Sequence, residues 1–168
     1  MTWLPFDLHP EYPPEGIPLA ELHRRYGIGS GEDDPLRPRF EAAGLTYDRP
    51  ATVPNTRLAL RLGELAREQG LHQPFHDRLM TAYWSEATNI GEAGELRRLA
   101  DEVGLDPDEV ERVIEDPSAF LAAVEGSTQQ ALRAGINAVP AFVLDRQLLV
   151  LGAQPIEVFR RAYEQLAA

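Results

Sequence analysis

Apolar residues recur at helical spacing along most of the chain, every three or four positions. The clearest set is Leu58, Leu62 and Leu65, which is followed by Gly70, a residue suited to the left-handed turn that ends helices. Similar patterns bordered by glycine, proline or a capping residue predict helices over residues 18–26, 35–43, 54–69, 73–86 and 92–103, a short helix from 107, one over 117–134 and a last one from 155. Helices therefore dominate the expected fold.

Strand patterns lie at the two ends of the chain. Residues 2–8 alternate, with Leu4, Phe6 and Leu8 on one side, and this predicts a half-buried strand. Because proline cannot donate to a sheet ladder, Pro5 would restrict this strand to a sheet edge.

Two apolar runs near the C-terminus, residues 141–144 and 147–151, predict a β-hairpin. Pro140 stands immediately before the first run and suits the first residue of a strand. From the residues alone the bond preceding Pro140 can be trans or, more rarely, cis. The order of strand, helical block, hairpin and helix indicates an α/β sheet interrupted by a helical insertion.

Composition excludes several classes of function. The net charge of −11 disfavours nucleic acid or an anionic membrane as partner. Lysine is absent, which excludes lysine Schiff-base chemistry and a P-loop. Cysteine is also absent, so the chain itself cannot form a disulfide, a thiolate metal site or a cysteine nucleophile.

The length of 168 residues suits one domain, or a core with one inserted subdomain. No apolar run is long enough to span a membrane, and the first residues lack the basic and apolar regions of a signal peptide. We therefore expect a cytoplasmic protein.

Other candidate sites have simpler structural explanations. His72 and His76 flank Pro74 without the glutamate of a zincin helix, so we interpret them as solvated histidines at a helix start rather than metal ligands. The acidic residues at 106–109 resemble a helix cap. Asn55 suits a cap as well, although it could also face a ligand cleft beside the proline.

Several segments together point to a known family. Residues 135–143, followed by 150–154 and a helix, resemble the C-terminal half of DsbA-like thioredoxin-fold oxidoreductases. Residues 6–10 with 14–16, and 54–56 at a helix start, resemble its cytosolic branch, which also includes 2-hydroxychromene-2-carboxylate isomerases. The resemblance covers nearly the whole chain.

This resemblance implies a thioredoxin-like fold formed by residues 1–16 and 135–168, with residues 17–134 as a helical insertion that includes the helix returning to the thioredoxin part. It also implies a cis bond before Pro140 and substrate binding by Val139, Pro140 and Asn55, without metal or cofactor. The implied partner is a thiol- or disulfide-containing peptide or a small thiol, bound for thiol–disulfide exchange.

The chain departs from the family pattern at its beginning. Family members start with a strand and a helix that carries Cys-x-x-Cys, or a serine in the isomerases, and this first β–α unit has no counterpart here. We therefore expect either a homodimer that pairs exposed sheet edges or a gene start further upstream. The expected function is that of a DsbA-family homologue that is redox-inactive as this chain; a glutathione-dependent isomerase and a non-catalytic peptide-binding module are the alternatives.

Overall fold

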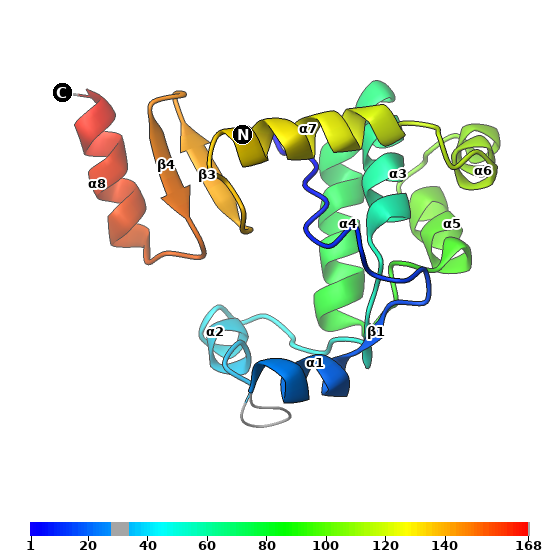
Figure 1. The fold of residues 1–168 in the computed structure, drawn as a ribbon, viewed down its shortest axis with the longest axis horizontal. Coiled ribbons are helices and arrows are strands. Elements are labelled where there is room, and N and C mark those ends of the chain that lie inside the picture. The colour runs from blue at the N-terminus through cyan, green and yellow to red at the C-terminus, as the bar shows by residue number, and fades with distance from the viewer. Residues whose placement is uncertain (28–33, 168) are drawn as a thin grey trace.

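The computed structural model describes residues 1–27 and 34–167. The glycine-rich, acidic residues 29–34 predict a polar loop, which apart from Asp34 lies outside the described residues. Figure 1 shows a helical body with a C-terminal hairpin and helix to one side. The helices are α1 (Leu19–Tyr26), α2 (Arg37–Ala42), α3 (Arg57–Glu68), α4 (His72–Ser85), α5 (Ala93–Glu102), α6 (Pro107–Glu115), α7 (Leu121–Arg133) and α8 (Ile156–Ala167). The strands are β1 (Ile17–Pro18), β2 (Thr52–Val53), β3 (Ala141–Leu144) and β4 (Leu148–Leu151).

The hydrophobic core lies among α3 to α7. Helix α3 packs against α4, α6 and α7, while α5 contacts α4 and α6. The largest fully buried side chains are Phe75, Leu62, Leu65, Leu96, Leu99, Val113 and Val124. Burying each of them contributes roughly 1.5–3 kcal/mol. The helical periodicity of the sequence thus identified the core correctly.

Two aspartates illustrate how local signals define helix starts. The Asp106 side chain accepts hydrogen bonds from the backbone N–H groups of Asp108 (2.9 Å) and Glu109 (3.3 Å), which confirms the predicted cap of α6. Asp116 instead accepts from both the backbone N–H (2.8 Å) and the hydroxyl (2.6 Å) of Ser118. Asp116 therefore caps a turn, and α7 begins four residues later than predicted.

The predicted strand over residues 2–8 is wrong. In the described part of the chain this segment pairs with no strand, and side chains of the helical body satisfy its backbone groups. The Asp7 backbone N–H donates to the Thr128 hydroxyl (2.9 Å), and the Arg67 guanidinium donates to the Trp3 carbonyl (2.6 Å). The segment is therefore held by side chains of α3 and α7 rather than by a sheet ladder.

Burial along this segment is also the reverse of the expectation. Pro5 and Asp7 are buried, and Asp7 forms an ion pair with Arg57 at 3.0 Å. Leu4 is 70% exposed and Leu8 is also exposed. Because Arg57 supplies a partner for the carboxylate, Asp7 can face inward together with Pro5, while Leu4 and Leu8 on the other side stay exposed and Phe6 is half-buried.

A two-residue sheet that the sequence did not predict joins β1 to β2, with Ile17 opposite Val53. Gly16 precedes β1 at a φ of 77°, and a Cβ there would lie only 2.5 Å from the Val53 carbonyl oxygen. This close approach requires glycine. Strands of two residues are too short to show an alternating pattern, which explains why the sequence gave no sign of them.

His72 and His76 are half-buried, so their interpretation as solvated residues is wrong. The Trp3 ring stacks on His76 at a centroid distance of 4.4 Å, and the two imidazoles stack at 6.1 Å. Arg67 Nη2 lies 2.9 Å from His72 Nε2. Burial lowers the pKa of both histidines, and the Arg67 charge lowers that of His72 further.

This stack predicts a loss of stability in mild acid. Because the folded-state pKa values lie below the ordinary value of 6.5, the unfolded chain binds more protons as the pH falls. The stabilisation of the fold by the neutral histidine stack is complete above pH 6.5. It is lost as the pH falls through the folded-state pKa values of the two histidines. Urea titrations at pH 7.5 and pH 5.5 should show this decrease, and it should be smaller in His76→Gln; an equal decrease in both proteins would contradict the prediction.

Candidate functional site

The candidate site begins where α7 ends and the chain turns into β3. Gly135 adopts a φ of 78°, and the backbone N–H of Ile136 donates to the Ala131 carbonyl at 3.0 Å, which closes the helix. Ile136 is buried, whereas the next residues, up to Pro140, are exposed. The bond between Val139 and Pro140 is cis, as the family resemblance implied.

Pro140 opens the β3–β4 ladder, as predicted. Its carbonyl accepts a hydrogen bond from the Gly152 backbone N–H at 2.8 Å, and Ala141 pairs with Leu151 in antiparallel register. Within the described residues β3 pairs only with β4. The other edge of β3 therefore presents N–H and C=O groups that an additional strand could use.

One face of this hairpin is covered by α8. Phe142 and Val150 are opposite each other on that face, and the Phe142 ring meets the Phe159 ring edge-on at 5.0 Å and 85°. Val150 is buried, but α8 has no buried residue of its own in the described structure. The core of the C-terminal unit is consequently small.

The opposite face of the hairpin, which we call the bare face, consists of Ala141, Val143, Leu149 and Leu151. Val143 is 56% exposed, and both leucines are exposed as well. Val139, at the entry to β3, is 50% exposed. An apolar sheet face beside an unpaired strand edge is the arrangement that binds a peptide as an added strand.

The described structure places Asn55 in a structural role near the start of α3. Its amide nitrogen donates to the Tyr12 carbonyl at 2.7 Å, and its amide oxygen accepts from the Arg57 backbone N–H at 3.0 Å. Neither contact involves Val139 or Pro140. In the view of Figure 1, α4 lies between α3 and the hairpin. The structure thus brings Val139 and Pro140 together at one edge but shows no contact between Asn55 and them.

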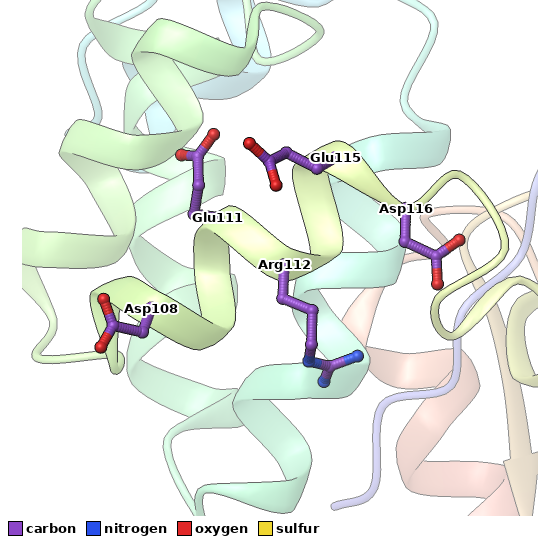
Figure 2. A pocket seen from close by; sticks show the side chains of 5 residues that line it. All are labelled: Asp108, Glu111, Arg112, Glu115 and Asp116. Carbon is purple, nitrogen blue, oxygen red and sulfur yellow. The ribbon is translucent and has the colours of Figure 1, made fainter.

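A hollow lies on the exposed side of α6. It is lined by Asp108, Glu111, Arg112, Glu115 and Asp116. Figure 2 shows the Glu111 and Glu115 carboxylates on one side of α6, with the Asp108, Arg112 and Asp116 side chains pointing elsewhere, so the four carboxylates do not converge on one point. Among residues 1–27 and 34–167, no three histidine or acidic side chains are placed to hold a metal ion. This hollow is a solvated helix face.

The sequence did not reveal the bare face. Every residue of β3 and β4 is apolar, so the pattern fits a strand buried on both faces and cannot show which face lacks a cover.

None of the described helices is long and apolar enough to cross a membrane.

Comparison with known proteins finds a matching family model and a relative in Bacillus subtilis. The family model of the DSBA-like thioredoxin domain matches residues 1–164. YwbO of Bacillus subtilis is 29% identical over 174 residues, which cover 96% of this chain and 80% of YwbO.

Solved structures agree with the sequence match. The crystal structure of the probable DsbA oxidoreductase SCO1869 from Streptomyces coelicolor superposes with a TM-score of 0.86 and 33% identity, covering 95% of this chain and 72% of that protein. The cytosolic disulfide reductase DsbM from Pseudomonas aeruginosa, solved with GSH, superposes with a TM-score of 0.61 and 22% identity, covering 84% and 79% of the two chains. The second likeness concerns the fold alone.

Proposed function

Because the chain belongs to the DSBA-like thioredoxin domain family, we propose that it binds an extended thiol- or disulfide-containing peptide along the free edge of β3, starting at Val139 and Pro140. The peptide would add a strand beside Ala141–Leu144. Its backbone would use the N–H and C=O groups of that edge, and alternate side chains would lie over the bare face.

The observation that supports this proposal most directly is the coincidence of an unpaired edge with an apolar face. Val143 and Leu149 are neighbours across the ladder and are both exposed. Burying such side chains under a bound peptide would contribute about 25 cal/mol for each Å² of apolar surface removed from water. The site therefore favours peptides with apolar residues at alternating positions.

Charge does not oppose such binding at this end of the molecule, although the whole chain carries −11. Neither β3 nor β4 contains an ionisable side chain. The acidic and basic residues of segment 134–168 are equal in number: Asp145, Glu157 and Glu164 against Arg146, Arg160 and Arg161. Peptides of either charge could therefore approach the edge.

The absence of cysteine determines what the chain can do with a bound disulfide. Thiol–disulfide exchange requires a thiolate that attacks a disulfide sulfur. No residue of this chain can supply one. As a separate polypeptide the protein would bind the peptide without cleaving its disulfide, and exchange would need a thiolate from another polypeptide segment.

The domain arrangement of the proposal follows the family fold. Residues 1–16 and 135–168 form the thioredoxin-like part, and residues 17–134 form the helical insertion. In the described structure this part leaves Leu4, Leu8 and the bare face exposed, together with Ile156 and Tyr163 of α8.

A peptide titration tests the proposed function. When a peptide with valine at alternate positions and a central mixed disulfide is added, the amide ¹H–¹⁵N NMR signals of Val139, residues 141–144 and residues 149–151 should shift. The signals of α5 residues should stay in place. The purified chain should not reduce insulin. Unchanged amide signals across the hairpin would contradict peptide binding, and insulin reduction would contradict the claim that the chain is redox-inactive.

A homodimer is the second candidate, favoured by the lack of charge on β3. Two copies of residues 141–144 could pair in antiparallel fashion across a two-fold axis without facing like charges. Sedimentation would show a dimer, which the disulfide peptide should dissociate because both compete for one edge. A monomer at all concentrations would exclude this candidate and leave the peptide site intact.

A further inference from the structure

A cavity of about 320 Å³ lies beside α1, at the end of the molecule opposite α7 in the view of Figure 1. We propose that this cavity, which we call the Arg49 pocket, binds the carboxylate group of a small organic acid. Its lining residues are Leu19, Ala20, His23, Asp34, Arg37, Tyr47, Asp48, Arg49 and Ala51.

Arg49 is the principal cation of the pocket and is held by aromatic rings. Its side chain is only 16% exposed. The guanidinium lies 5.2 Å from the Trp84 ring centroid and 5.9 Å from that of Tyr83, and Nη2 donates to the Tyr83 hydroxyl at 3.3 Å. These contacts position the guanidinium against the two rings but do not themselves neutralise its charge.

Asp34, the acid that forms an ion pair with Arg49, is hydrogen-bonded to other groups. The Asp34 carboxylate accepts hydrogen bonds from the Tyr47 hydroxyl at 2.5 Å and from the Leu36 backbone N–H at 2.9 Å. Its separation from Arg49 Nη1 is 3.9 Å, which is beyond hydrogen-bond distance. Asp34 therefore balances part of the charge of Arg49 without satisfying its donors.

Two buried nitrogen atoms of the pocket lack a hydrogen-bond partner within the described residues. They are Arg49 Nε and His23 Nδ1. The third such side-chain atom in the described structure, Arg78 Nη1, is not part of the pocket. Buried polar atoms nearly always have partners, so two unpaired nitrogens on residues that line one cavity favour a ligand that accepts hydrogen bonds there.

The chemistry of the donors favours a carboxylate. Arg49 Nε is always a donor, and His23 Nδ1 donates when that nitrogen carries the proton. The two oxygens of one carboxylate can accept from both, and hydrogen bonds to a charged acceptor are stronger than neutral ones. Two arginines and two aspartates line the cavity, so a monoanion disturbs the local charge balance less than a dianionic phosphate.

The remaining walls limit the body of the acid. Leu19, Ala20, Ala51 and the Tyr47 ring supply apolar surface. The volume lies at the small end of the range for ligand pockets, roughly 300–1,000 Å³. A short aliphatic or single-ring carboxylic acid fits this combination of size and polarity.

Benzoate is the probe for the test, with ¹H–¹⁵N spectra of arginine side chains as readout. Benzoate should shift the Arg49 Nε–Hε signal in a saturable manner, with a Kd in the millimolar range, roughly −4 kcal/mol. Arg49→Lys, which keeps the positive charge over Trp84 but lacks the Nε–H group, should weaken binding at least tenfold. His23→Phe should also weaken it, and acetate should bind less tightly than benzoate.

Arg78→Gln is the matched control because Arg78 also has an unpaired buried nitrogen but lies outside the pocket. It should leave benzoate affinity unchanged. An immobile Arg49 signal, an equal shift with sodium chloride of the same ionic strength, or equal losses in Arg78→Gln and Arg49→Lys would each overturn the proposal. Inorganic phosphate binding more tightly than benzoate would overturn the assignment to a carboxylate.

Discussion

Replacing Arg61 by methionine is expected to lower the free energy of unfolding by about 2–4 kcal/mol, because buried backbone carbonyls lose their donor. Arg61 lies in α3 and its side chain is buried in the helical body. Nε donates to the Ala119 carbonyl at 2.7 Å, and Nη2 donates to the carbonyls of Val113 and Asp116. One side chain thus closes the end of α6 and the turn that leads to α7.

Methionine matches the length of the arginine stem but provides no donor. The carbonyl groups at the end of α6 would then either accept a hydrogen bond from a water molecule in a crowded interior or remain unpaired. Burial lowers the pKa of Arg61, although the Asp116 charge partly opposes this. The destabilisation should therefore come mainly from lost hydrogen bonds rather than from a lost ion pair.

Urea unfolding followed by circular dichroism measures the effect. Arg61→Lys should recover part of the loss, since an ammonium group can reach some of the carbonyls but not all. Arg97→Met is the matched control: Arg97 lies on the exposed face of α5 in an ion pair with Glu111, and such pairs contribute about 0–1 kcal/mol. Similar losses for Arg61→Met and Arg97→Met would show that the carbonyl contacts do not stabilise the fold.

The helical body was predictable because its signals are local. Leu62, Leu65 and Phe75 recur at helical spacing and are fully buried. Asp106 followed by Pro107 fixes the start of α6 through hydrogen bonds within one turn. Patterns of this kind depend only on neighbouring residues, and therefore the sequence alone reveals them.

Features that depend on distant residues were not predictable. The alternation over residues 2–8 is real, but Arg57 and Thr128, far away in the chain, decide that Asp7 faces inward. The role of Arg61 likewise depends on where α6 ends. In both cases a polar side chain is buried because a partner from another element satisfies it.

The candidate site was predictable only in part. The start of β3 at Pro140 follows from the chemistry of proline, and the hairpin follows from two apolar runs. For Asn55 the sequence suits both a cap and a ligand contact, and in the structure its amide bonds to the Tyr12 carbonyl and the Arg57 backbone N–H. The bare face emerges only when α8 is seen to cover the other side.

Introducing a charge at the centre of the bare face should reduce peptide binding strongly. Val143→Lys places an ammonium group where the proposed peptide would bury an apolar side chain. Affinity for the disulfide peptide should fall at least tenfold, equivalent to about 1.4 kcal/mol or more. Because Val143 is already exposed, the free energy of unfolding should change by only about 0.5 kcal/mol.

Leu45→Lys provides the matched control, since Leu45 is 58% exposed, close to the 56% of Val143, and follows α2 rather than lying on the hairpin. In fluorescence anisotropy titrations, the affinity of the Leu45→Lys variant for the peptide should equal that of the unaltered protein. Equal affinities for all three proteins would show that the peptide does not use the bare face. Equal losses in both variants would instead indicate attraction between the peptide and the overall negative charge of the protein, which either lysine would weaken.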